Sequence, residues 1–252
     1  MNAGIPTPNN NAQGAPSFNP PPKILSKKEY LKEKGSPDAK KAAKLSLVFF
    51  LVTVVIALFA IFTVLNSDIY KLPVVSFFGE DVADELKHTL EDDTEEMVDD
   101  MKWDLENNRH KMEKSEIKAT KKVIDAFDEF EDNPSIMNLN TIANVVRSEA
   151  EEIDSDRVQA GYEDSELESS LIILNVVFWA VIVMGLFPLL FVFLSYNAKS
   201  IALGVLGIIF SLSFNICLAG IVFALLYIVS VIVMCVFHSK VNKEYKAYKA
   251  SL

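Results

Sequence analysis

The chain has 252 residues, half of which are apolar, and a formal net charge of −10 at pH 7. Its apolar residues are gathered into a few long blocks, a distribution that excludes an ordinary soluble domain and predicts an all-α membrane protein. Because no catalytic, cofactor-binding or metal-binding signature is recognisable, we expect a protein that is not an enzyme and has no cofactor. We also expect no nucleic-acid partner, since the overall charge is acidic.

The first 44 residues precede the first apolar block and divide into two parts. Residues 1–22 are rich in Pro, Asn, Gly and Ala. Such a segment cannot bury enough apolar surface to offset its ordering entropy, so a disordered cytoplasmic tail is predicted. Residues 23–44 form a basic juxtamembrane segment. Its stretch Ile24–Lys34 is expected to lie on the inner leaflet, where attraction to anionic lipid contributes about 1 kcal/mol per Lys.

Three blocks contain no Asp, Glu, Lys, Arg or His: Leu45–Leu65, Leu171–Leu194 and Ile201–Phe237. Each exceeds the roughly 18 residues that a helix needs to cross the hydrocarbon of a bilayer. We therefore predict a first transmembrane helix at 45–66 and a second at 171–195. The long basic lead and the 21-residue apolar stretch of the first helix favour a retained signal anchor over a cleaved signal peptide.

The third block is too long for one crossing, because 37 helical residues would extend roughly 55 Å. A reversal is expected around Ser213–Ile216, where Ser and Asn supply a polar break. This predicts transmembrane helices at 201–215 and 218–237, entered through a short loop at 196–200. Small residues in this hairpin are predicted to make the close helix contacts. They are Gly204, Gly207, Gly220 and Ala224.

Charge predicts the orientation of the four helices. Residues 1–44 hold eight Lys and three acidic residues, the loop at 196–200 holds Lys199, and residues 238–252 hold four Lys and one Glu. A four-helix arrangement places these three segments on one side, which the positive-inside rule makes the cytoplasm. We therefore predict a multi-pass plasma-membrane protein with both termini cytoplasmic. Its two basic tails, at 23–44 and 238–252, are expected to meet anionic inner-leaflet lipid.

The segment 67–170 is predicted to lie outside the cytoplasm. It holds 30 acidic and 11 basic residues, a net charge of −19. Its apolar residues recur at helical spacing and predict one long amphipathic helix up to Asp132. The first apolar stripe consists of Val82, Leu86, Leu90, Met97, Met101, Leu105 and Met112, extended by Ile117, Ile124 and Phe127.

The sequence Asp132-Asn133-Pro134 is expected to end this helix, because Pro disfavours helical geometry in the residue before it. A second apolar stripe follows. It consists of Ile136, Leu139, Ile142, Val145, Val146, Ile153 and Val158. The two stripes predict an acidic extracytoplasmic helical hairpin with coiled-coil packing, completed by a partner or by a second copy. The preceding stretch Ile69–Phe78 has two interpretations: aromatic residues at the outer headgroup level, or a short edge strand or packing plug.

Three groups of chemically active residues have simple structural interpretations. The acidic run Glu91–Asp100 lacks the calcium-loop pattern and is expected to be a solvated helix face. His88 and His110 are 22 residues apart, roughly 33 Å along a straight helix, and are expected at the surface. His238 is expected on the other side of the membrane, also as a surface residue. Cys217 and Cys235 are expected near opposite ends of the last helix, where they act as small apolar residues.

The last hairpin carries a family resemblance. The sequence AKSIALGVLGIIFSL followed by AGIVFALLYIVSVIVM, within Asn197–Met234, resembles the paired-helix membrane module of small bacterial proteins of unknown function that often have Pro- and Asn-rich cytoplasmic leaders. The likeness covers about one sixth of the chain. Those proteins typically have a richer glycine pattern and no preceding acidic exterior of about 100 residues. The resemblance implies a bacterial plasma membrane and transfers no catalytic residue.

Two hypotheses for the function follow. The first is a non-enzymatic envelope scaffold or sensor, whose acidic exterior helices bind a protein partner or self-associate. The second is a small channel or an accessory subunit of a membrane transporter. Transport proteins often place ionisable side chains inside the bilayer, whereas the apolar blocks here hold none, so the first hypothesis is preferred.

Overall fold

The computed structural model describes residues 24–78, 80–149, 165–198 and 200–252, and these are almost entirely helical. Four helices are long and apolar enough to cross a membrane. They are α2 (Pro37–Asn66), α8 (Ser165–Ala198), α9 (Ile201–Phe214) with the π-helical turn η3 (Asn215–Ala219), and α10 (Ile221–Ala250). The other described helices are α1 (Lys27–Glu33), η1 (Ile69–Lys71), α3 (Pro73–Phe78), α4 (Glu80–Asn107), α5 (Lys114–Asp132) and α6 (Ile136–Glu149).

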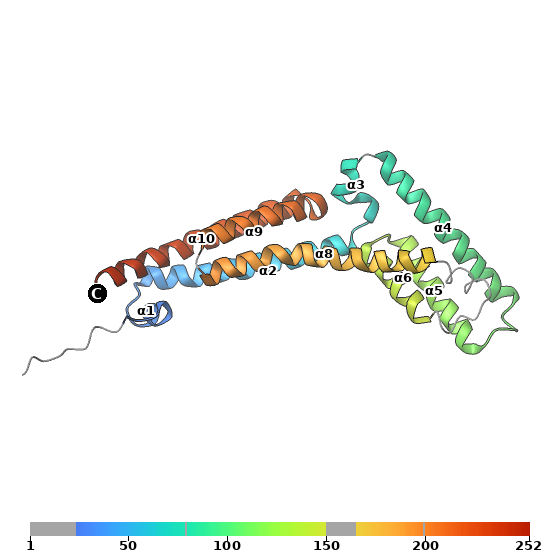
Figure 1. Cartoon of the computed structure of the whole chain (residues 1–252), viewed down its shortest axis with the longest axis horizontal. Coiled ribbons are helices and arrows are strands. Elements are labelled where there is room, and N and C mark those ends of the chain that lie inside the picture. Colours follow the sequence, from blue (N-terminus) through green and yellow to red (C-terminus); the bar gives the residue numbers. More distant parts are fainter. Residues whose placement is uncertain (1–23, 79, 150–164, 199) are drawn as a thin grey trace, which may run out of the picture.

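The four long helices pack side by side in an elongated bundle (Figure 1). α10 lies along α2, α9 lies along α8, and α2 also contacts α8. The outward faces of all four helices expose large apolar side chains, including Phe59, Val183, Ile209 and Val229. Such a surface is unstable in water and is suited to lipid, so the expected multi-pass, all-α membrane architecture is confirmed at this level.

The long helices extend beyond their apolar stretches. α2 begins at Pro37, eight residues before the predicted start at 45, because Ser36 caps it and Pro favours the first helical position. α8 begins at Ser165 rather than at 171. α10 continues through the basic tail to Ala250, since Lys and Ala are good helix formers and nothing in 238–250 breaks the helix.

The last hairpin reverses at Gly220, later than the expected Ser213–Ile216. The side-chain amide of Asn215 donates hydrogen bonds to the carbonyl and hydroxyl of Ser211, at 2.8 and 2.7 Å, and so continues the helix instead of breaking it. Gly220 then adopts φ 94° and ψ 163°, a conformation that is essentially restricted to glycine. The return helix therefore starts at Ile221, not at 218.

Between Glu80 and Glu149 the acidic segment forms three helices, so the prediction of one helix up to Asp132 is wrong. α4 ends at Asn107 and α5 begins at Lys114. Asn107 and Asn108 favour this break, and Glu113 starts the new helix through a capping box with Glu116. The predicted end at Asp132 is confirmed, because α6 begins after a turn at Asn133–Ser135. We call α4, α5 and α6 the acidic head.

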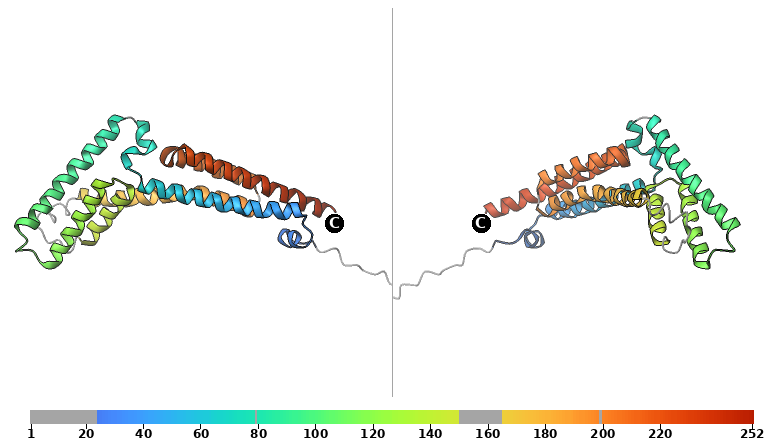
Figure 2. Two further views of the ribbon diagram at one scale, coloured as in Figure 1. Left: turned by 180° about the vertical axis from the view of Figure 1, so that it is seen from behind. Right: turned by 45° about the vertical axis from the view of Figure 1, so that its right-hand side comes forward.

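Both described ends of the chain lie at one end of the bundle, and the acidic head lies at the other (Figures 1 and 2). A single apolar core joins the bundle to the head: it runs from Ile61 and Val64 of α2, past Ile69 and Leu72, to Phe127 of α5. The stretch Ile69–Phe78 thus contributes a packing plug through Ile69 and Leu72, and it forms η1 and α3 rather than a strand.

Candidate functional site

The facing sides of α4 and α5 build the apolar part of the acidic head. Val98 and Met101 of α4 are buried, as are Val123, Phe127 and Phe130 of α5. These positions follow one face of each helix at steps of three and four residues. The two helices meet along this face, but they leave a gap towards the bundle.

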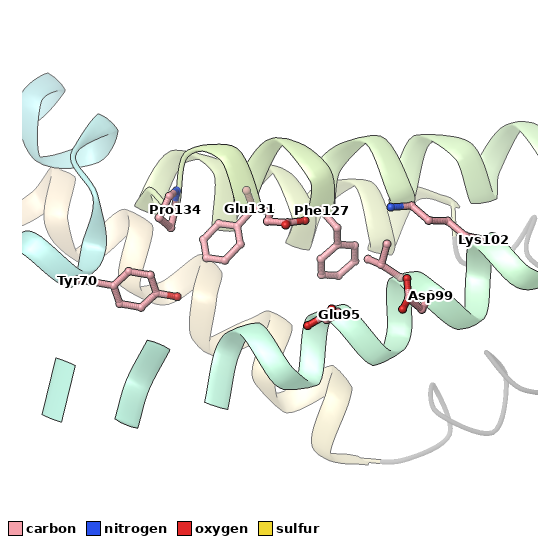
Figure 3. A pocket seen from close by; sticks show the side chains of 9 residues that line it. Tyr70, Glu95, Asp99, Lys102, Phe127, Glu131 and Pro134 are labelled. Atoms are coloured by element: carbon pink, nitrogen blue, oxygen red, sulfur yellow. The ribbon is translucent and has the colours of Figure 1, made fainter. Parts of the chain in front are cut away.

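The gap is a pocket of about 390 Å³ (Figure 3). Val98, Phe127 and Phe130 form an apolar floor, and the carboxylates of Glu95, Asp99 and Glu131 stand at an exposed rim. Lys102, Pro134 and Tyr70 complete the lining. The volume lies within the range typical of ligand pockets, roughly 300 to 1,000 Å³.

Tyr70 and Pro134 come from segments that are held together at the membrane end of the head. The backbone N–H of Ile69 donates to the carbonyl of Pro134 at 2.8 Å, and an isolated bridge joins Asp68 to Ser135. The hydroxyl of Tyr70 points into the gap (Figure 3). The pocket is therefore walled on one side by the chain that leaves the first membrane helix.

One ion pair closes the far side of the pocket. Lys102 of α4 donates to the carboxylate of Asp128 of α5 at 3.0 Å. This hydrogen bond raises the pKa of the Lys102 ammonium above its ordinary value, so the side chain remains charged at neutral pH. With Lys102 engaged by Asp128, the three rim carboxylates leave the pocket with an anionic mouth over an apolar floor.

The chemistry of this lining is suited to a positively charged group that carries an apolar body. The cation gains from the rim carboxylates and from the faces of buried Phe rings, and its apolar part replaces water over Val98. Among the described residues, no three His, Cys, Asp or Glu side chains gather in a way that would hold a metal ion.

The predicted apolar stripe of α4 is only partly described. Met101 is buried, and Met97 and Leu105 pack against the same core. This part of the stripe is therefore an internal contact within the apolar core. Side-chain positions are not described for the remaining three stripe residues, which are Val82, Leu86 and Leu90.

The predicted packing residues divide into two groups. Gly204 and Gly207 are buried at helix contacts: a Cβ added to Gly207 would lie 3.0 Å from Cγ2 of Val192. Ala224 is also buried. An added Cβ at Gly220, by contrast, meets nothing within 4 Å, so this glycine serves the turn and not the close helix contact expected of it.

Sequence reasoning missed a tighter contact at Gly185 of α8. A Cβ on Gly185 would clash with the side chain of Ile61 and lie 3.1 Å from Cζ of Phe214. Gly185 lies one turn before Pro188, at the place where α8 packs against Ile61 of α2. No sequence signal distinguishes such a glycine, because its partner is about 120 residues away.

The basic tails, expected to contact anionic lipid, also contact each other. Tyr30 of α1 is buried, and its ring stacks on Tyr248 with centroids 4.6 Å apart. The Tyr30 hydroxyl donates to Glu244 at 2.9 Å. Lys27 pairs with Asn242, and the hydroxyl of Tyr245 donates to the carbonyl of Leu25 at 2.8 Å. We call this α1–α10 contact the terminal clasp.

The predicted disordered tail at 1–22 lies outside the described residues, as do Ile153 and Val158 of the second stripe. Comparison with protein-family models, with curated proteins and with solved structures found no match to this chain. Functional inference therefore depends on the chain's own residues.

Proposed function

We propose that this chain is a non-enzymatic plasma-membrane protein that binds a protein partner through the pocket of its acidic head. The observation that carries the proposal is the combination of an apolar floor, made by Val98, Phe127 and Phe130, with an acidic rim. A purely solvated acidic helix would have the rim without the floor.

The partner's chemistry follows from charge complementarity. The segment 67–170 has a net charge of −19, so a basic partner is attracted over a distance and other acidic surfaces are repelled. At the pocket, a Lys or Arg side chain fits best, because its aliphatic stem can lie on Phe127 while its cation meets Glu95 and Asp99. The proposed partner element is a basic amphipathic segment.

The attachment of the head supports a role in presenting this pocket at a fixed distance from the membrane. The hydrogen bond between Ile69 and Pro134 ties the start of the head to its α5–α6 turn. α6 also packs against α8 and α2, and the apolar core continues across this junction. A head joined in this way moves with the bundle, as a scaffold or a sensor requires.

The proposed orientation places both termini in the cytoplasm and the acidic head on the opposite side. The positive-inside rule supports it, because residues 1–44 have a net charge of +5 and residues 238–252 a net charge of +3. The lysines of both tails would then meet anionic inner-leaflet lipid. The family resemblance favours a bacterial plasma membrane.

The alternative function, a channel or a transporter subunit, receives less support from the bundle. Thr53 of α2 donates to the hydroxyl of Ser230 of α10 at 2.9 Å, and Asn215 donates to Ser211. The two hydroxyls and the amide nitrogen of Asn215 are engaged in contacts within the bundle, which is the usual role of such groups in membrane helix packing.

Binding of a defined peptide to the full-length protein in lipid nanodiscs tests the proposal. The probe is a labelled amphipathic peptide of Lys and Leu, with a Glu–Leu peptide as the negative control. The double variant Glu95→Gln/Asp99→Asn removes two rim charges, whereas Glu96→Gln/Asp100→Asn removes two exposed charges from the same helix outside the pocket. We expect the rim variant to lose about tenfold in affinity for the Lys–Leu peptide and the matched variant less than threefold. The reason is that the rim carboxylates would contact the bound cation, whereas the other two charges attract it only over a distance. Equal losses would show non-specific attraction and contradict a pocket.

A further inference from the structure

A second cavity lies at the end of the bundle where both termini meet. It has a volume of about 10 Å³, enough for one water-sized occupant. Its walls come from the end of α8, the start of α9 and the middle of α10. The lining residues are Ser195, Ser200, Ile201, Met234, Cys235 and His238.

Three of these residues carry soft or borderline metal-ligand atoms, and all three come from α10. Met234 and His238 are four positions apart and Cys235 and His238 are three apart, so each pair lies on one face of the helix. Helical spacings of three and four are those at which paired side chains bind one metal ion in other proteins. Residues that carry a thioether, a thiol and an imidazole therefore line one small cavity.

The surroundings keep this cavity narrow and shielded. Met234 is 1% exposed, so its sulfur is withdrawn from solvent. Gly204 of α9 faces the thiol: a Cβ there would lie 2.9 Å from Sγ of Cys235 and 3.1 Å from Oγ of Ser195. Only a glycine at 204 leaves this space open beside the thiol.

The imidazole of His238 is oriented from α2. Its Nδ1 lies 3.5 Å from Oγ of Ser46, whose hydroxyl also lies 3.4 Å from the carbonyl of Met234. Histidines that bind a metal through one ring nitrogen are commonly oriented by a polar contact at the other.

We propose that Met234, Cys235 and His238 form a site for a soft monovalent metal ion, Cu(I), at the membrane boundary near the termini. Thiolate and thioether sulfur select Cu(I) over harder cations, and imidazole completes a three-coordinate set. Binding replaces the proton of the Cys235 thiol by the metal and releases that proton to water, with no change in oxidation state. The proposal is independent of the pocket in the acidic head.

Competition for Cu(I) measures the affinity directly. The full-length protein in detergent is titrated with Cu(I), kept reduced by ascorbate, against a chromogenic Cu(I) chelator. We expect one tight equivalent per chain. Cys235→Ser should weaken Cu(I) binding at least 100-fold. Ser46→Ala should weaken it about tenfold, because Ser46 would only orient a metal ligand and residues of that kind typically change metal affinity by about 10- to 100-fold. Cys217→Ser removes the other cysteine, which lies on the exposed side of η3, and should leave binding unchanged.

Met234→Leu tests the third ligand without disturbing the packing, because Leu and Met have similar volumes. It should weaken binding about tenfold while the thermal unfolding curve stays the same, so the test holds even if Cys235→Ser folds poorly. Binding that is equally sensitive to Cys217→Ser would overturn the proposal. So would unchanged binding in both Met234→Leu and His238→Gln, because a thiol alone would then account for the metal.

Discussion

Glu244, near the C-terminal end of α10, accepts hydrogen bonds from both the backbone N–H and the hydroxyl of Ser36, at 2.9 and 2.6 Å. Ser36 is the residue that caps α2, so the carboxylate also lies at the positive end of that helix dipole. Tyr30 donates the third hydrogen bond. One acidic side chain in an otherwise basic tail thus joins α1, α2 and α10.

Replacing Glu244 by Gln should loosen the terminal clasp without unfolding the bundle. The substitution removes the charge from three hydrogen bonds, which costs about 1.5 kcal/mol and corresponds to roughly tenfold more frequent opening of α1. Amide hydrogen exchange over residues 27–33 measures this opening. Glu33→Gln is the matched control, because Glu33 is exposed on α1. Exchange that is equally fast in both variants would contradict the clasp.

The clasp should also depend on pH, with loss at both extremes. Hydrogen bonds from the Ser36 hydroxyl and backbone hold the pKa of Glu244 below its ordinary value. The stabilisation is therefore present above the ordinary Glu pKa and is lost as pH falls through the lowered one. Burial, followed by the contact with Glu244, raises the pKa of Tyr30. That contribution is present below the ordinary Tyr pKa and is lost as pH rises through the raised one.

Hydrogen exchange of α1 as a function of pH, corrected for the intrinsic exchange rate, reports these two transitions. Protection should be constant around neutral pH. In Glu244→Gln the acid transition should disappear, whereas the alkaline transition of Tyr30 should persist. An acid transition of unchanged size in that variant would show that another group controls the clasp.

The crossing at Gly185 should tolerate no side chain. Gly185→Ala would drive its methyl group into Ile61, an overpacking that costs about 1 to 3 kcal/mol. The added substitution Ile61→Ala should recover part of this loss, because it removes the clashing atoms. Gly220→Ala costs about 1 to 3 kcal/mol for a different reason, its backbone conformation, and should not be rescued by Ile61→Ala. Thermal unfolding in detergent measures all four variants.

Pattern and charge predicted the features of this fold that depend on local sequence. The stretch at 45–65 forms a helix because it is uncharged and long, and the turn at Asn133–Ser135 follows from Pro134. The break after Asn107 was missed, because the apolar stripe continues across it on both sides. Its signal was the pair Asn107 and Asn108, which favours a turn over a helix.

The candidate sites depend on contacts between distant residues, which periodicity does not report. The acidic rim around Glu95 and Glu131 was visible only as a charged helix face until α4 and α5 were brought together. Met234 and Cys235 resemble ordinary lipid-facing or core residues in the sequence. They line a cavity only because α9 folds back along α10 and brings Gly204 next to Cys235.

The hydrogen bond between Thr53 and Ser230 should contribute modestly to the bundle. Polar pairs of this kind between membrane helices stabilise the folded bundle by about 0.6 kcal/mol on average. The value is small because the same polar side chains find other hydrogen-bond partners when the helices are separated. Thr53→Val, Ser230→Ala and the double variant form a cycle, and we expect a coupling energy of about 0.5 to 1 kcal/mol in reversible unfolding. Strictly additive losses would show that the 2.9 Å contact does not form in the bilayer.

The orientation of the bundle can be tested at two exposed serines on opposite ends of the molecule. Ser115 lies in the first turn of α5, and Ser251 follows α10. In a background of Cys217→Ser/Cys235→Ser, a membrane-impermeant maleimide applied to intact cells should modify Ser115→Cys and spare Ser251→Cys, because the positive-inside rule predicts that the basic tails stay in the cytoplasm. After permeabilisation both should react. Labelling of Ser251→Cys in intact cells would show that the orientation in the membrane is the opposite of the one proposed. The acidic pocket and its basic partner would then lie on the cytoplasmic side.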